Sequence, residues 1–227
     1  MRDRIAEVLE IIAQAERASG RPSGSAALMA VTKNRSIREI HEAASCGITL
    51  FGENRVQELA GKSSDLPEGI SMHMIGALQS NKAAKAVELS DCIQSVDREK
   101  ILVRIDRCAL QADRIMDIMV EVNTSGEPSK HGVETEDDLM RLIERSLSCQ
   151  SVRLTGLMTL GPLSGDEAAI RGSFAKLRQL RERVEASFGE LGGLMLSMGM
   201  SGDFAIAVEE GSDLVRVGTA IFGRAHG

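Results

Sequence analysis

A lysine stands at the end of an apolar run near the beginning of the chain. Lys33 follows residues 26–32, which predict a short buried strand, and a helical pattern begins a few residues later. In α/β barrels the chemistry collects at the carboxyl ends of the strands. An amine beside apolar walls there is partly desolvated and nucleophilic, which is the environment of a Schiff-base lysine. Taken alone, however, a lysine that ends a strand more often does so to reach water.

An arginine in the last apolar run is the second candidate. Within residues 213–217, strand alternation places Arg216 on one face and its two valine neighbours on the other. The eighth strand of a barrel closes against the first, so we expect Arg216 and Lys33 to face the same mouth. A buried arginine needs a partner. That partner is either an internal carboxylate, Glu53 or Glu121, or the ring nitrogen or carboxylate of a ligand.

Two glycine-containing segments near the end of the chain have the composition of a phosphate site. They are residues 197–204 and 216–223, which follow the seventh and eighth predicted strands. Barrel enzymes build phosphate sites from these loops, because free backbone N–H groups and a helix dipole favour an anion. We expect Ser201 to cap the helix that begins directly after it, and its hydroxyl and the amides of Gly218 and Thr219 to be donors. Without a ligand, the alternative is a plain N-cap serine and a plain turn glycine.

Strand and helix patterns alternate along most of the chain. Residues 2–19 form an amphipathic pattern that predicts an N-terminal helix. The strands are predicted near residues 26–32, 48–52, 70–75, 92–96, 117–123, 153–159, 193–198 and 213–217. Eight such units without a Pro- or Gly-rich linker favour one α/β domain over residues 1–227, a (β/α)8 TIM barrel with an extra N-terminal helix. The alternative is an open doubly wound sheet, because the fourth strand is weak and the helix after the seventh is short.

Composition limits the classes of partner. The 227 residues carry 27 basic and 33 acidic side chains, mixed along the chain, for a net charge of -6, which argues against non-specific nucleic-acid binding. No apolar run approaches the roughly 18 residues of a membrane helix. The four cysteines are far apart, with no Cys-x-x-Cys and no histidine spacing suited to a metal. We expect a soluble cytoplasmic protein with reduced thiols, no metal site and no membrane partner.

Six ordered motifs resemble the pyridoxal phosphate homeostasis proteins (PROSC-like), and the resemblance covers nearly the whole chain. The fold of that family is similar to the N-terminal barrel domain of alanine racemase, the fold-type III class of pyridoxal phosphate proteins. The motifs are Ala30-Val31-Thr32-Lys33, Phe51-Gly52-Glu53-Asn54 with Gln57-Glu58, His73 to Lys82, Gly156-Leu157-Met158, Ser197 to Asp203 and Val215 to Gly223. Two positions depart from the family pattern. Position 72 is Met instead of the usual Trp, and position 55 is Arg where an aromatic residue is common.

The resemblance implies a cofactor and a set of residues that hold it. It implies that Lys33 forms the internal aldimine with pyridoxal 5'-phosphate, the vitamin B6 cofactor, and that Arg216 faces the pyridine nitrogen. It further implies that Ser201, Gly218 and Thr219 hold the phosphate. Asn54 and Met200 are expected near the cofactor ring.

Chemistry favours a carrier over an enzyme. A racemase of this fold type needs a second acid/base, normally a tyrosine from an additional β domain, and this chain contains no tyrosine. A permanently cationic arginine at the pyridine nitrogen also disfavours protonation and weakens carbanion stabilisation. We therefore expect a non-catalytic, monomeric protein that buffers pyridoxal phosphate or delivers it to apo-enzymes.

Two alternatives belong to the enzyme class. One is a minimal racemase or lyase that uses His73, Lys82 or a water molecule as the missing base. The other, less favoured, is an aldolase or isomerase that uses Lys33 on a sugar phosphate.

Overall fold

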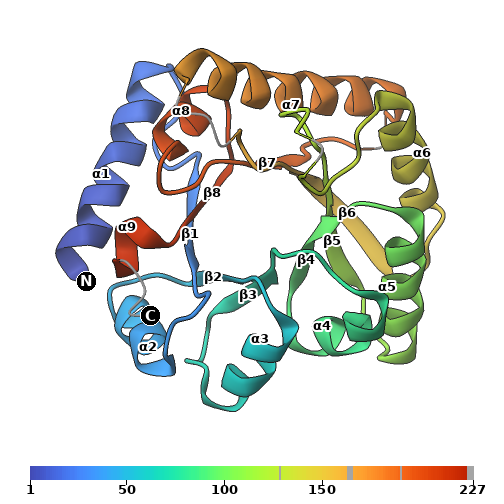
Figure 1. Ribbon diagram of the computed structural model, residues 1–227, viewed down its shortest axis with the longest axis horizontal. Coiled ribbons are helices and arrows are strands. Elements are labelled where there is room, and N and C mark those ends of the chain that lie inside the picture. Colours follow the sequence, from blue (N-terminus) through green and yellow to red (C-terminus); the bar gives the residue numbers. More distant parts are fainter. Residues whose placement is uncertain (128, 163–165, 190, 224–227) are drawn as a thin grey trace.

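Eight parallel strands close into a barrel in the order β1 to β8 (Figure 1). The computed structural model describes residues 1–127, 129–162, 166–189 and 191–223. The strands are β1 (Ala27–Val31), β2 (Leu50–Glu53), β3 (Ser71–Met74), β4 (Cys92–Val96), β5 (Met116–Glu121), β6 (Val152–Met158), β7 (Met195–Ser197) and β8 (Leu214–Val217). All eight were predicted from the sequence, to within a few residues at their ends. Strand β8 pairs with β1, with Arg216 opposite Met29, so the barrel is closed and the open sheet is wrong.

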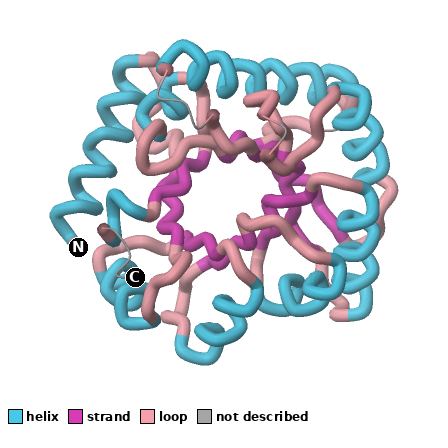
Figure 2. The backbone as a smooth tube through the Cα atoms, viewed as in Figure 1, coloured by secondary structure: helices cyan, strands magenta, loops and turns pink. Residues whose placement is uncertain are grey.

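Helices surround the barrel on its outside (Figure 2). They are α1 (Arg2–Ala18), α2 (Ile37–Ser45), α3 (Val56–Lys62), α4 (Ala83–Leu89), α5 (Glu99–Gln111), α6 (Glu136–Leu147), α7 (Glu167–Ser187), α8 (Phe204–Glu209) and α9 (Thr219–Phe222), with short 3-10 turns η1 (Ser63–Asp65) and η2 (Ser80–Lys82). Local sequence sets their starts. Helix α2, for example, begins with a capping box in which Ser36 and Glu39 each bond the other's backbone amide.

The extra N-terminal helix α1 packs against α8 and α9, beside the seam between β8 and β1 (Figure 1). Its buried face includes Ile12, and its last turn carries a buried carboxylate, Glu16, which is 2% exposed. The carboxylate of Glu16 accepts hydrogen bonds from the amides of Gly24 and Ala26, at 2.9 and 2.8 Å. Helix α1 therefore fixes the segment that leads into β1.

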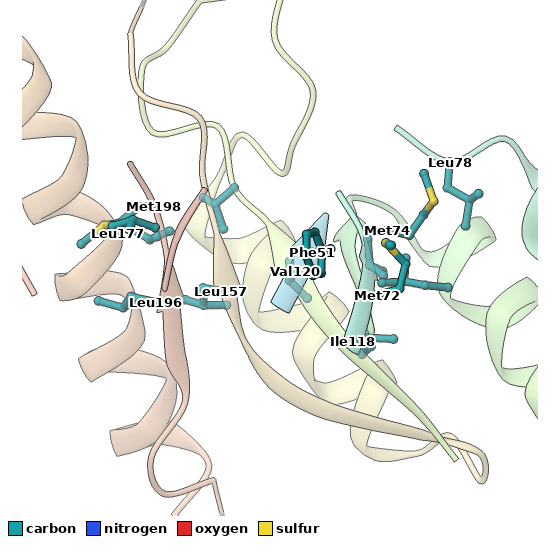
Figure 3. Close-up of a cluster of buried hydrophobic side chains, with 14 of the residues drawn as sticks. Phe51, Met72, Met74, Leu78, Ile118, Val120, Leu157, Leu177, Leu196 and Met198 are labelled. Atoms are coloured by element: carbon teal, nitrogen blue, oxygen red, sulfur yellow. The ribbon is translucent and has the colours of Figure 1, made fainter. Parts of the chain in front are cut away.

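The main core lies between the barrel and its helices. Side chains that point outward from the strands, such as Phe51, Leu157 and Leu196, pack against the inner faces of the helices (Figure 3). Met72, at the position where the resemblance leads us to expect Trp, belongs to this layer and is 3% exposed. The side chain at position 72 therefore contributes to the packing outside the barrel.

A smaller apolar cluster fills the inside of the barrel. Its members are Met29, Cys92, Met119, Met158 and Leu214. Cys92 is the first residue of β4, so it lies at the amino-terminal floor of the barrel. Burial, with the nearby Asp117 carboxylate, raises the pKa of this thiol far above its usual range. All four cysteines are free.

Among the described residues, no helix has both the length and the apolar character needed to cross a membrane.

Candidate functional site

A cavity of about 480 Å³ opens at the carboxyl ends of the strands. We call it the mouth cavity. It brings together six of the seven residues that the sequence nominates, namely Asn54, Met200, Ser201, Arg216, Gly218 and Thr219. The rest of its wall is formed by Val31, Ile75, Gly76, Ala77, Glu121, His131, Leu160 and Gly202. Residues far apart in the chain thus meet because parallel strands end at one rim.

Lys33, the seventh nominated residue, lies beside this cavity without lining it. It occupies the turn after β1, its side chain is exposed, and its amine has no hydrogen-bond or ion-pair partner among the described residues. Strand alternation relates it to Met29, inside the barrel, and to Val31, in the cavity wall. The next residue, Asn34, has a positive φ of 56° and donates its amide to Glu58 at 2.9 Å. That Lys33 faces the cavity stays a prediction.

Arg216 is buried at the base of the mouth cavity, with 3% of its surface exposed. It donates hydrogen bonds to the hydroxyl of Ser197 at 2.6 Å and to the carbonyl of Thr159 at 2.7 Å. Burial lowers its pKa to about 10, while the carboxylates of Glu121 and Asp203 oppose that shift. The guanidinium therefore stays charged at neutral pH.

The predicted alternative partners of Arg216 behave differently from each other. Glu53 is wrong as a partner, because its carboxylate pairs with Lys62 at 2.8 Å and accepts the hydroxyl of Thr32 at 2.8 Å. Glu53 faces the outside of the barrel, where Lys62 of α3 reaches it. The negative charge of Glu121 raises the pKa of Arg216, although the two side chains form no ion pair.

A chain of hydrogen bonds continues from Arg216 across the barrel interior. Because Ser197 accepts from Arg216, its hydroxyl donates to the Oε1 atom of Gln94 at 2.7 Å. The amide nitrogen of Gln94 lies 2.8 Å from the Nδ1 atom of His73. Burial lowers the pKa of His73 to about 4, against the opposing carboxylates of Asp91 and Asp117. Neutral His73 therefore accepts this bond at Nδ1, and β8, β7, β4 and β3 are joined in one directional chain.

Ser201 joins the two loops that the sequence nominates as a phosphate site. Its hydroxyl oxygen accepts from the amides of Gly218 at 3.2 Å and Ala220 at 3.3 Å, at the first turn of α9. The prediction that Ser201 caps the following helix is wrong, because α8 begins at Phe204 with Asp203 as its N-cap. The carboxylate of Asp203 instead accepts the amide of Met200 at 2.5 Å. The hydroxyl proton of Ser201 is left available to a ligand.

Asn54 contributes an unpaired acceptor. Its Oδ1 atom is buried and has no hydrogen-bond partner among the described residues, which costs about 1–3 kcal/mol when no ligand supplies a donor. The loop after β3 lies tightly against it, because a Cβ at Gly76 would approach the carbonyl oxygen of Asn54 to 2.1 Å. The absence of a side chain at position 76 therefore leaves room for the backbone of Asn54 at the wall of the cavity.

Two ionisable wall residues, Glu121 and His131, are not among the seven residues nominated as cofactor ligands, although the sequence named Glu121 as an alternative partner of Arg216. Glu121 is 4% exposed, and burial, with the nearby Asp97, raises the pKa of its carboxyl group to about 7. Its position at the end of β5 is the signal that pointed to the mouth. His131 also lies after β5, but in a long loop where no strand or helix pattern in the sequence fixes its position.

The donors and acceptors of the mouth cavity fit pyridoxal 5'-phosphate. The hydroxyl proton of Ser201 and the amide of Thr219 suit an oxyanion, whereas the amides of Gly218 and Ala220 already donate to the hydroxyl oxygen of Ser201. Arg216 supplies a fixed cation, and Asn54 supplies the unpaired acceptor described above. An acyclic sugar phosphate would use the anion site but would leave the arginine without an aromatic ring nitrogen to meet.

The fold and this site define a barrel of the alanine racemase class. The family model for the alanine racemase N-terminal domain matches residues 9–226. The chain belongs to the family of pyridoxal phosphate homeostasis proteins. It is 37% identical over 222 residues to the pyridoxal phosphate homeostasis protein of Aquifex aeolicus, covering 97% of this chain and 96% of that protein. The relative of the same name from Vibrio alginolyticus is 39% identical over 213 residues, covering 92% and 90%.

Solved structures agree with this assignment. PipY from Synechococcus elongatus, solved with PLP bound, is 36% identical with a TM-score of 0.82, covering 93% of this chain and all of that one. A protein from Bifidobacterium adolescentis is 40% identical with a TM-score of 0.92, covering 97% and 94%. Alanine racemase from Streptomyces coelicolor, at 22% identity and a TM-score of 0.74, shares the fold over 57% of its length. The predicted family and barrel are confirmed.

Proposed function

We propose that this chain binds pyridoxal 5'-phosphate in the mouth cavity and serves its homeostasis without turning over a substrate. The observation that carries the proposal is the convergence on one cavity of Arg216, the Ser201 and α9 cradle, and the unpaired oxygen of Asn54. The relatives named above support it through their names and through the cofactor bound to PipY.

Each nominated residue has a role in this proposal. Ser201, Gly218 and Thr219 hold the phosphate, and Arg216 faces the pyridine nitrogen as a fixed cation. Asn54 and Met200 flank the ring. When bound, the cofactor supplies an electrophilic aldehyde. The amine of Lys33 adds to this aldehyde and water leaves, so that the group is stored as a Schiff base; the exposed side chain of Lys33 must first turn toward the cavity.

The surroundings of Arg216 favour storage over turnover. Its two hydrogen bonds keep a cation where a carboxylate would be needed to hold the ring nitrogen protonated. The bases considered from the sequence are also badly placed. His73 lies beneath Gln94 with a pKa near 4, and Lys82 lines a neighbouring cavity. The chain contains no tyrosine.

The proposal also covers the oligomeric state, the location and the partners of the protein. We propose that the protein acts in the cytoplasm as a monomer and passes the cofactor to apo-enzymes. Four free thiols support the cytoplasmic location. Large apolar side chains are exposed at only seven of the described positions, which supports the monomer.

Absorbance and mass spectrometry of the purified protein test the cofactor and its link together. We expect an imine band that borohydride abolishes, with the mass of the reduced cofactor on the peptide that contains Lys33. Lys33→Ala should lose the band, while Lys85→Ala, an exposed lysine on α4, should keep it. A Lys33→Ala protein that stays equally coloured would refute the Schiff-base assignment.

A second candidate is a minimal racemase or lyase, and one observation favours it. Glu121 lines the mouth cavity with a pKa near 7, in the range of a general acid or base. Incubation of the holo-protein with single L-amino acids in deuterated water distinguishes the two. The carrier predicts α-proton exchange at the rate of the free cofactor, whereas faster exchange that Glu121→Gln abolishes would establish the enzyme.

A further inference from the structure

A second cavity, of about 660 Å³, adjoins the mouth cavity on the same face of the barrel. We call it the basic cavity. Its wall includes Arg55, Glu58, Ala77, Lys82, Arg98 and His131. Ala77 and His131 belong to the walls of both cavities. The two spaces are therefore neighbours at the carboxyl ends of β2 to β5.

The charge of the basic cavity is opposite to that of the protein. Arg55, Lys82 and Arg98 line it against a single carboxylate, Glu58, although the whole chain has a net charge of -6. A local excess of cations in a concave wall attracts anions. The four charged groups come from the segments that follow β2, β3 and β4. The excess of positive charge therefore arises only when the chain folds.

The single carboxylate is already engaged outside the cavity. Glu58 accepts the amide of Asn34 at 2.9 Å and lies 3.6 Å from the amine of Lys62. Its ion pair with Arg55, at 3.5 Å, is thus shared with other donors. Arg55 is 64% exposed and keeps most of its donors free.

The other two cations differ in their freedom. The amine of Lys82 has no hydrogen-bond or ion-pair partner within the described part of the chain, although the residue is half-buried. Arg98 is fixed in the wall, because it pairs with Asp97 at 2.5 Å and donates to the carbonyl of Leu78 at 3.3 Å. Arg55 and Lys82 are therefore the groups that remain to bind a ligand.

We propose that the basic cavity binds the carboxylate of an amino acid, with Arg55 and Lys82 as its ligands. The inference rests on the proposed function. A bound aldehyde reacts with primary amines, and amino acids are the broad class of small molecules that carry both an amine and a carboxylate. A carboxylate in the basic cavity leaves the amine beside the wall shared with the mouth cavity. Two free cations favour an amino acid with a second carboxylate.

Arg55 lies next to a residue of the mouth cavity in the sequence. It follows Asn54 directly. The two consecutive residues at the end of β2 thus serve different cavities, Asn54 the mouth cavity and Arg55 the basic cavity.

Calorimetric titration separates this proposal from the proposed function. The probe is glutarate, a dicarboxylate without an amine, added to the protein freed of cofactor and to the borohydride-reduced holo-protein. We expect saturable binding to both, weakened about tenfold in Arg55→Gln and in Lys82→Gln, as for the loss of one charge-assisted hydrogen bond. Arg17→Gln, at 63% exposure on α1, and Lys85→Gln on α4 are matched controls that should bind like the wild type.

Two results would overturn the site. One is an absence of saturable glutarate binding by a protein that still shows the imine band, which would leave the proposed function intact. The other is inorganic phosphate binding as tightly as glutarate, or equal binding by all four variants, which would mark an unselective charge effect. Circular dichroism checks that Arg55→Gln and Lys82→Gln are folded; both side chains lie at the rim, so we expect unchanged spectra.

Discussion

The carboxyl group of Glu121 is nearly enclosed by the barrel, and this changes its acidity. Its pKa is raised from 4.5 to about 7 by burial and by Asp97, while Arg216 opposes the shift. Between these values the folded protein holds a proton that the unfolded chain releases. Its contribution to stability is therefore present at low pH and is lost as the pH rises through this window.

We expect Glu121→Gln to remove this pH dependence. The wild-type contribution amounts to about 3 kcal/mol across the window, because each pH unit between the two pKa values is worth about 1.4 kcal/mol. Urea unfolding at about pH 5 and about pH 8 measures this contribution. We expect the free energy of unfolding of the variant, relative to that of the wild type, to be higher at pH 8 than at pH 5. A constant difference at both pH values would contradict the raised pKa.

Single residues also show where sequence reasoning succeeds and fails. Lys33, Ser201 and Arg216 were nominated because each lies near the end of a predicted strand or in the segment directly after it, and strand ends share one rim in a barrel. The partners were less accessible. Ser201 meets the amides of the next loop, and Gln94 lies 103 positions from Ser197, so no local pattern announces either contact.

Among the elements, strands β3, β4, β7 and β8 are linked through side chains as well as through their backbones. The directional chain from Arg216 through Ser197 and Gln94 to His73 leaves each group with its matching partner. Such networks are costly to interrupt, because the neighbours are left buried and unsatisfied.

We expect Gln94→Leu to lower the free energy of unfolding by about 2–4 kcal/mol, since Ser197 and His73 each lose a partner. His73→Gln is the matched variant, because its amide oxygen can still accept the bond from Gln94, and it should cost much less at neutral pH. Chemical denaturation at pH 7 compares the two. Equal losses would show that the chain of bonds contributes nothing beyond packing.

The pH dependence of His73 has the opposite sign to that of Glu121. Its pKa is lowered from 6.5 to about 4, so below pH 6.5 the unfolded chain gains a proton that the folded protein refuses. Stability is lost as the pH falls through this window, by about 3 kcal/mol in total. In the wild type the pH dependences that Glu121 and His73 give to the free energy of unfolding nearly cancel between pH 4.5 and 6.5. In Glu121→Gln only the effect of His73 remains, so the stability should rise with pH in this window. In His73→Gln only the effect of Glu121 remains, so the stability should fall.

For the whole molecule, helix α1 substitutes for the short helices that follow β7 and β8. Helices α8 and α9 are too short to cover the seam between β8 and β1, and α1 packs over both. Its buried face and the carboxylate of Glu16 make it part of the barrel wall. The sequence predicted this helix from its periodicity, while its place on the molecule followed only from the structure.

We expect Ile12→Ala, on the buried face of α1, to destabilise the whole barrel by about 2–4 kcal/mol. Ile12 is 4% exposed, whereas Leu9 on the same helix is 47% exposed and serves as the control position for Leu9→Ala. A single cooperative urea transition that shifts for Ile12→Ala and stays for Leu9→Ala is the expected result. A separate early transition would mean that α1 unfolds independently.

Predictability at this scale came from repetition. Eight similar strand and helix units favoured a closed barrel over an open sheet, and the weak fourth strand, predicted at residues 92–96, is present as β4. The depth of each side chain could not be foreseen in the same way, since it depends on how the whole ring twists and packs.

The position of the buried Cys92 thiol bears on whether the protein's own cysteines can react with a bound aldehyde. Thiolates add to aldehydes, so a chain that stores an aldehyde risks being trapped by its own cysteines. Cys92 lies at the opposite end of the barrel from the mouth, and its raised pKa keeps it protonated. The described wall of the mouth cavity contains no cysteine. If the proposed function holds, this arrangement keeps the Cys92 thiol protonated and at the far end of the barrel from the aldehyde that Lys33 would bind.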